Sequence, residues 1–254
     1  MSGSVGVVVP AYQPDVDRLR EYLRSIEGRI DPAVIRIEYD APRPGEADRL
    51  ADVATAINTV PRRRGKGAAI TAGFEALDTD VLAFADADGA TPAAELATVI
   101  DTVRSGRADL AAGSRRHPDA EVMTHQTRTR RHLGDAFAWF ARRMLDADLY
   151  DYQCGAKAIT AEGWDRVRDH LYEPGFAWDV ELIAMAGALD LRVEEVPVQW
   201  YDRPGSTVSP VRASLELGQA LLSARHRAKR LRNSRLHGAI AERRDEPTAL
   251  VEEK

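Results

Sequence analysis

Val81-Leu82-Ala83-Phe84-Ala85-Asp86-Ala87-Asp88-Gly89 begins as an uninterrupted apolar run and ends in two carboxylates separated by one residue. A short apolar run of this kind is typical of a strand that is buried on both faces of a parallel sheet. In open α/β sheets, ligands bind beyond the carboxyl ends of the strands. Gly89 permits a turn there, so Asp86 and Asp88 need not point to opposite faces. The stretch therefore predicts a strand that ends at a binding site.

Strand and helix patterns alternate on both sides of this stretch. Repeating units of about 25–40 residues predict an α/β fold with a mostly parallel central sheet flanked by helices. Strands are expected at 5–9, 34–39, 59–60, 81–85 and 193–200; helices are expected near 19–26, 50–57, 67–77, 132–145, from 179 onward and at 215–231.

Polar residues follow the first four expected strands. They are Tyr12 to Asp15, Tyr39-Asp40, Arg62 to Lys66 and Asp86 to Asp88. Because the carboxyl ends of parallel strands share one edge of the sheet, these groups are predicted to converge on one site.

Composition limits the possible partners and location. The chain has 254 residues and is 44% hydrophobic, which is enough for one sizeable core. Its formal net charge of -5 implies no general affinity for nucleic acid. A single cysteine excludes an internal disulfide and fits a reducing compartment. The start lacks a signal-peptide pattern, and no window approaches the roughly 18 apolar residues of a spanning helix. These features predict a cytoplasmic protein whose membrane contact is peripheral.

Three regions are expected along the chain. Residues 1–212 form the catalytic α/β domain, 213–238 a basic amphipathic helix, and 239–254 a charged, disordered tail. The segment from Arg225 to Arg235 has six cations and no acid. Such a helix suits an anionic membrane surface, and it suits packing on the domain or on a membrane-protein partner equally well.

Several residue groups have the chemistry of a phosphate site. Asp86 and Asp88 offer the hard oxygen ligands that suit Mg²⁺ or Mn²⁺ next to substrate phosphates, although a solvated acidic loop has the same pattern. Arg62 to Gly67 opens a helix with glycines and cations, which favours an anion or, equally, a solvated turn. Arginines downstream suit forked phosphate contacts, although most of them fit solvated surface positions equally well. They are Arg115, Arg116, Arg128, Arg130 and Arg131.

Asp179 has two interpretations. At a helix start it is either an N-cap or a carboxylate that faces the acceptor. Cys154 has no evident histidine partner, so it is interpreted as a small buried residue and not as a nucleophile.

The ordered motifs resemble the family 2 glycosyltransferases, whose fold is called GT-A, over roughly residues 4 to 225. The motifs are Val7 to Tyr12, Arg64 to Ala69, Ala85 to Pro92, Gly113 to Arg115, Gln153 to Lys157, Trp178 to Leu182, and Glu195 to Val198 with Gly205-Ser206. The later ones are similar to the branch of dolichyl-phosphate glucosyltransferases and mannosyltransferases. Asp-Ala-Asp-Gly-Ala-Thr and Gln-Cys-Gly favour the glucosyltransferase side.

The resemblance implies a role for each matching position. Pro10, Ala11 and Tyr12 would line the base and ribose pocket, Asp40 would bond the base, and Lys66 would lie near the donor. Asp86 and Asp88 would hold the metal and the donor's ribose-diphosphate. Ser114, Arg115, Arg128 and Arg131 would receive the acceptor phosphate, and Asp179 would face the reacting sugar. The implied reaction moves a hexose from a UDP- or GDP-sugar to dolichyl or polyprenyl phosphate, with inversion, at the cytoplasmic face of the membrane.

This sequence departs from the family pattern at four places. Gln13 replaces an Asn, Tyr152 a Thr, and Ala156 an aromatic residue. Tyr39-Asp40-Ala41-Pro42 keeps one acid of the usual Asp-Asp-Gly-Ser, which leaves the choice between UDP and GDP open.

Three other functions are compatible with these patterns. A family 2 enzyme that extends a lipid-linked glycan would use a sugar hydroxyl as acceptor and Asp179 as base. A nucleotidyltransferase would have a Gly-rich basic loop after the first strand, where this chain has Pro10-Ala11-Tyr12-Gln13. A non-catalytic sugar-nucleotide binding protein would have no need of both Asp86 and Asp88.

Overall fold

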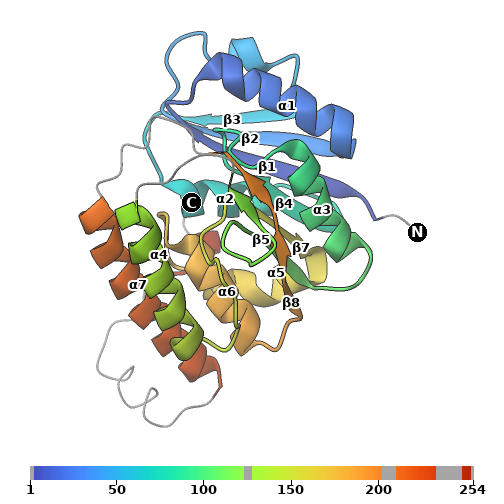
Figure 1. Cartoon of the computed structure of the whole chain (residues 1–254). Coiled ribbons are helices and arrows are strands. Elements are labelled where there is room, and N and C mark those ends of the chain that lie inside the picture. Colours follow the sequence, from blue (N-terminus) through green and yellow to red (C-terminus); the bar gives the residue numbers. More distant parts are fainter. Residues whose placement is uncertain (1–2, 123–127, 202–209, 233–247, 253–254) are drawn as a thin grey trace.

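The computed structural model places a seven-stranded sheet between two layers of helices (Figure 1). It describes residues 3–122, 128–201, 210–232 and 248–252, and only the backbone at 128–133 and 210–216. The strands of the sheet are β1 (Val5–Tyr12), β2 (Val34–Asp40), β3 (Ala56–Val60), β4 (Val81–Ala85), β5 (Leu110–Ser114), β7 (Ala156–Thr160) and β8 (Val193–Pro197). Their spatial order is β3-β2-β1-β4-β7-β5-β8.

One strand of the sheet runs against the others. β7 lies between β4 and β5 and is antiparallel to both, while the remaining pairs are parallel. Ala85, the last residue of β4, is therefore opposite Ala156, the first residue of β7. This arrangement brings the segment before β7 to the carboxyl edge of β4, and it confirms the predicted mostly parallel sheet.

The helices cover both faces of the sheet and form two separate cores. α1 (Val16–Ile30) and α3 (Ala93–Arg104) pack on one face, to which Val7 and Val9 point. Val8 points to the other face, because side chains alternate along a strand. That face is covered by α2 (Lys66–Glu75), α4 (Arg128–Met144), α5 (Ala161–Val167), α6 (Trp178–Ala188) and α7 (Pro210–Leu231).

Two predicted elements differ in the structure. The helix expected at 50–57 is wrong: a single 3-10 turn, η1 (Asp48–Leu50), precedes strand β3. Leu50 and Val53 lie in an irregular segment and are both buried, so their spacing in the sequence resembles that of a helix. Residues 56–60 form a strand because they pair with β2. The strand expected at 193–200 is divided into β8 and β9 (Gln199–Trp200), because β9 pairs with β6 (Glu121–Val122) in a second small sheet.

The C-terminal region returns to the domain. α7 buries Leu221, Ala224 and Ala228 against it, and Figure 1 shows this helix beside α4. After 232 the next described residues are 248–252, which contain a short 3-10 turn, η3 (Leu250–Glu252). Ala249 and Leu250 are buried, so the expectation of a disordered tail is wrong for these residues; 233–247 and 253–254 lie outside the described part.

Within the described residues, the structure has no helix that is both long and apolar enough to cross a membrane.

Candidate active site

Asp86 and Asp88 share one turn at the end of β4. The backbone N–H of Asp86 donates to Gly155 O (2.9 Å), and Asp88 Oδ1 accepts from the N–H of Ala90 (2.9 Å). Gly89 makes the turn with a φ of 62°. The Asp86 side chain is 40% exposed at this edge, so it is accessible to a ligand.

Gly155 leaves the space that the Asp86 side chain uses. A Cβ at Gly155 would lie 1.9 Å from Asp86 Oδ2, well inside the distance of any real contact. The position of the Asp86 side chain therefore depends on a glycine that is 69 positions away in the sequence and directly precedes the antiparallel strand β7.

Two carboxylates at a substrate site fit Mg²⁺ or Mn²⁺, which keep several waters and bind one or two carboxylates besides the substrate's phosphates. Across the part of the chain that the structure describes, there is no cluster of three or more His, Cys, Asp or Glu side chains that could hold a metal by itself. The donor set thus suits a cation that arrives with a diphosphate, and it does not suit a tightly held structural metal.

Lys66, the first residue of α2, connects the strand end to α6. Its Nζ lies 2.9 Å from Asp86 Oδ1 and 2.9 Å from Asp179 Oδ2. Burial alone would lower the pKa of Lys66, but the two carboxylates raise it above its ordinary value. The ammonium stays charged beside the position predicted for the donor's diphosphate.

Asp179 is held by a second lysine. Lys157 Nζ lies 2.7 Å from Asp179 Oδ1 and donates to Cys154 O at 2.7 Å. Burial would raise the pKa of Asp179, but Lys157 and Lys66 lower it below its ordinary value. The N-cap interpretation is wrong, because Ala177 is the N-cap of α6 and the Asp179 side chain points to the lysines.

Asp40 shapes the loop that precedes Lys66. It accepts from the backbone N–H groups of Arg64 (2.7 Å) and Gly65 (3.2 Å), and from Arg64 Nε (2.8 Å). Glu38 is buried beside Asp40, and its Oε2 accepts a hydrogen bond from Arg64 Nη2 at 2.9 Å. These contacts give Asp40 a structural function in the loop; its bond to the base stays a prediction.

Tyr12 lies exposed at the end of β1, with the Arg63 guanidinium 4.5 Å from its ring centroid. Ala11 is buried and Pro10 is partly buried. The end of β1, the loop after β3 and the end of β4 therefore offer aromatic, cationic and acidic groups from three neighbouring segments. The expected convergence at one sheet edge is confirmed for Lys66 and Asp86, which are in direct contact. Asp179 of α6, which was not among the residues expected there, contacts the same lysine.

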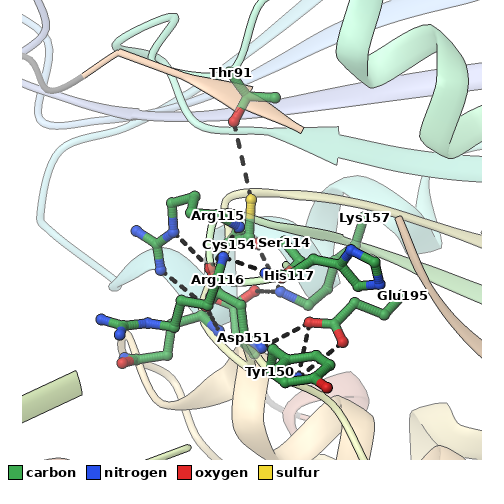
Figure 2. A network of polar contacts seen from close by, with 12 residues as sticks. Thr91, Ser114, Arg115, Arg116, His117, Tyr150, Asp151, Cys154, Lys157 and Glu195 are labelled. Atoms are coloured by element: carbon green, nitrogen blue, oxygen red, sulfur yellow. Dashed lines mark hydrogen bonds and ion pairs between the residues drawn. The ribbon is translucent and has the colours of Figure 1, made fainter. Parts of the chain in front are cut away.

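Two of the residues predicted for the acceptor phosphate, Ser114 and Arg115, have partners within the protein (Figure 2). Ser114 is buried, and its hydroxyl accepts from the N–H groups of Arg116 (3.2 Å) and His117 (2.9 Å). Arg115 forms a forked pair with Asp151 through Nε (2.6 Å) and Nη2 (2.9 Å). Burial would raise the pKa of Asp151, but Arg115 lowers it. Arg115 and Ser114 thus organise this loop, and their contact with a phosphate stays a prediction.

Arg128 and Arg131 lie at the start of α4, where the described structure includes only the backbone. Their predicted contact with the acceptor phosphate therefore falls outside the described side chains. Cys154 is buried, with Sγ 4.0 Å from Thr91 Oγ1, and burial raises the pKa of its thiol to about 11. The interpretation of Cys154 as a small buried residue is confirmed.

Comparison with known proteins identifies the family. The sequence profile described as Glycosyl transferase family 2 matches residues 7–159, more than half of the chain. The chain belongs to glycosyl transferase family 2. It is a glycosyltransferase, and several of its relatives are named dolichyl-phosphate beta-glucosyltransferase.

Two relatives of this family 2 glycosyltransferase are informative. Dolichyl-phosphate beta-glucosyltransferase of Mus musculus is 32% identical over 249 residues, which cover 88% of this chain and 75% of that protein. Glycosyltransferase AglD of Haloferax volcanii is 33% identical over 230 residues, 86% of this chain, but the match spans only 36% of AglD.

Solved structures confirm the GT-A fold. Glucosyl-3-phosphoglycerate synthase of Mycobacterium tuberculosis, crystallised with Mn²⁺, UDP and phosphoglyceric acid, superposes with a TM-score of 0.68 at 14% identity, over 88% of this chain and 78% of that one. At this identity the likeness extends to the fold alone.

The sequence did not predict the contacts of three residues at or near this site. Lys157 was named only as part of a motif, and no partner was predicted for Asp151 or Glu181. Asp151 had a visible signal, because a lone acid next to Tyr150 and Tyr152 near a family motif is a candidate partner for an arginine. Lys157 reaches the site through the antiparallel pairing of β7, and Glu181 meets Arg227 through the packing of α6 against α7.

Proposed function

We propose that this family 2 glycosyltransferase moves a hexose, glucose or mannose, from a UDP- or GDP-sugar to dolichyl or polyprenyl phosphate with the help of Mg²⁺ or Mn²⁺. The observation that carries the proposal is the pair of lysines on Asp179. Each oxygen of the Asp179 carboxylate contacts a lysine, so Asp179 is poorly suited to remove a proton from an acceptor. An acceptor that is already anionic needs no base, and the relative named dolichyl-phosphate beta-glucosyltransferase supports that acceptor class.

The residues around Asp86 suit the departure of a nucleoside diphosphate. Asp86 and Asp88 would hold the divalent metal, which stabilises negative charge on the leaving diphosphate. Lys66 lies 2.9 Å from Asp86 and adds a fixed positive charge at the same place. Tyr12 and Arg63 offer an aromatic ring and a cation to the nucleotide at the end of β1.

The reaction would be a single displacement. An oxygen of the acceptor phosphate attacks the anomeric carbon, the bond from that carbon to the diphosphate oxygen breaks, and its electron pair leaves with the diphosphate. No proton has to move, because a phosphate monoester has a second pKa near ~6 and is largely dianionic at neutral pH. Direct attack inverts the anomeric centre, so the product is a β-linked sugar phosphate; an α-linked product on NMR would exclude the single displacement.

One assay tests the proposal directly. The purified chain is incubated with Mn²⁺ or Mg²⁺, a panel of UDP- and GDP-sugars, and a short polyprenyl phosphate, and products are identified by mass spectrometry. We expect the mass of one hexose added to the lipid phosphate with one preferred nucleotide. A parallel incubation replaces the lipid phosphate with a lipid-linked glycan, and addition of the hexose only there would favour the hydroxyl-acceptor enzyme instead.

We also propose a peripheral membrane contact at the cytoplasmic face, through α4. Three described basic side chains of α7 contact the domain: Arg225 Nη1 donates to Met144 O at 2.6 Å, Arg227 pairs with Glu181, and Lys229 Nζ lies 2.9 Å from Asp146. On α4, Trp139 and Phe140 are 49% and 54% exposed, which suits an interfacial position for these aromatic side chains. Flotation with anionic vesicles tests this contact: a Trp139→Ser/Phe140→Ser variant should lose binding, and unchanged flotation would exclude the contact.

A further inference from the structure

The segment 171–175 packs directly on the start of α2, where Lys66 lies. The N–H of Ala68 donates to Pro174 O at 3.1 Å. A Cβ at Gly65 would lie 2.4 Å from Pro174 O, and a Cβ at Gly67 would lie 2.4 Å from Glu173 O. The two backbones are thus in contact without an intervening side chain, so the position of the segment determines where α2 begins.

Glu181 holds this segment from the side of α6. Its Oε2 accepts from the N–H groups of Tyr172 (2.7 Å) and Glu173 (2.8 Å). The other oxygen pairs with Arg227 of α7, whose guanidinium also lies 4.5 Å from the Tyr172 ring centroid. Arg227 therefore contacts both Tyr172 and the carboxylate that fixes the backbone of the segment.

A second C-terminal element reaches the same segment. The N–H of Leu250 donates to Leu171 O at 2.8 Å, and the Leu250 side chain is buried in the core below α2. Arg227 and Leu250 thus both contact segment 171–175, whose Glu173 and Pro174 carbonyls lie against the α2 start.

We infer that Arg227 is a positioning residue for the donor site: through Glu181 and segment 171–175, it keeps Lys66 within reach of Asp86 and Asp179. This inference rests on the proposed function in one respect, namely that Lys66 lies next to the bound donor. The C-terminal helix then acts on nucleotide binding without touching the nucleotide. Loss of Arg227 leaves Glu181 as a buried carboxylate without its cation, which loosens its bonds to the segment.

The test compares two substitutions on the same helix. Arg227→Met removes the contact to Glu181, and Arg225→Met is the matched control, because Arg225 Nη1 donates instead to Met144 O (2.6 Å). Hydrogen exchange at the amides of 66–69 measures the α2 start without a ligand. Calorimetry with UDP and with GDP, each with Mn²⁺, measures nucleotide affinity, and thermal unfolding reports on the fold.

Arg227→Met is expected to speed exchange at 66–69 and to weaken binding of the preferred nucleotide on the order of tenfold, since small displacements of binding groups have effects of this size. Arg225→Met should change neither, and Arg227→Lys, which keeps the charge, should restore part of both. If Arg227→Met does not fold, exchange at 66–69 and nucleotide affinity are measured in Arg227→Lys instead, and wild-type values of both would overturn the inference.

Unchanged exchange in Arg227→Met would overturn the inference, as would equal effects of the two Met variants. Faster exchange with unchanged nucleotide affinity would overturn the role of Arg227 in positioning Lys66. A wild-type chain that binds neither nucleotide would count against the proposed function, and exchange at 66–69 would still decide whether Arg227 braces the α2 start.

Discussion

Lys157 Nζ lies 2.7 Å from Asp179 Oδ1, and both side chains are almost completely buried. Lys157 comes from the central antiparallel strand β7, and Asp179 from the first turn of α6. The other oxygen of Asp179 contacts Lys66, which extends to Asp86. A continuous line of alternating charges therefore runs from the interior to the exposed carboxylate of the site.

Lys157→Met removes the innermost charge of this line and leaves Asp179 with Lys66 alone. Removal of one partner of a buried ion pair costs about 3–5 kcal/mol of the free energy of unfolding when the remaining charge is left uncompensated. Because Asp179 keeps Lys66, we expect a loss below that range. Urea unfolding measures the loss. The double variant Lys157→Met/Asp179→Asn should be less destabilised than the sum of the single variants; strict additivity would mean that the two side chains do not interact.

Gly155→Ala should damage the site while the fold persists. Its methyl group would displace the Asp86 carboxylate, so we expect the transfer rate to fall by about tenfold or more. The matched control is Gly28→Ala in α1, where a Cβ meets nothing within 4 Å and should add up to about 1 kcal/mol of stability. Transfer rate and unfolding are measured for both. Wild-type activity in Gly155→Ala would show that the position of Asp86 is not critical.

Asp179→Asn distinguishes the two kinds of acceptor. If Asp179 were the general base for a sugar hydroxyl, its loss would cost about 10²–10⁴-fold in turnover. If it only orders Lys66 and Lys157 beside a phosphate acceptor, the loss is expected to stay near or below the lower end of that range. The turnover number with polyprenyl phosphate decides, with thermal unfolding as the check that the variant folds.

The pH dependence of kcat/KM should reflect the ionisation of the acceptor phosphate and not of an enzyme side chain. The lysines lower the pKa of Asp179, so this carboxylate stays ionised above about pH 4. Its contribution to stability is present above that pH and is lost only as the pH falls through the lowered folded pKa. Burial raises the pKa of Cys154 to about 11, so its thiol stays neutral at physiological pH.

Between about pH 5 and 9, kcat/KM should therefore fall only on the acid side, near ~6, where the acceptor phosphate takes up a proton. An isosteric phosphonate acceptor, which has a higher second pKa, should move this limb to higher pH. A limb that does not move would assign the ionisation to the enzyme.

Removal of metal should abolish transfer. Charge stabilisation by a divalent cation amounts to several kcal/mol, so EDTA is expected to lower the rate by more than about a hundredfold, with recovery on addition of Mn²⁺. Asp88→Asn should raise the Mn²⁺ concentration required for half-maximal rate. Asp101→Asn, at the exposed end of α3, is the control. Full activity in EDTA would exclude metal dependence.

Local patterns predicted most of the elements near the site. The strand 81–85 is predicted with its observed bounds, because a short apolar run followed by acids leaves little ambiguity. Helix 50–57 failed because Leu50 and Val53 are buried by packing under α1 and not by helical periodicity. The burial of Ala249 and Leu250 was not predicted, because these two apolar residues lie within a charged, polar segment. Leu250 packs in a core whose other members are distant in the sequence.

By itself, the sequence determined the α/β class, the acidic turn after β4 and the family, since these depend on neighbouring residues and ordered motifs. Only the tertiary structure decided which charges meet. The antiparallel course of β7 places Gly155 under Asp86 and Lys157 against Asp179, and the return of α7 places Arg227 on Glu181. Such contacts join residues up to 113 positions apart, and their geometry depends on strand order and helix packing, which local patterns do not specify.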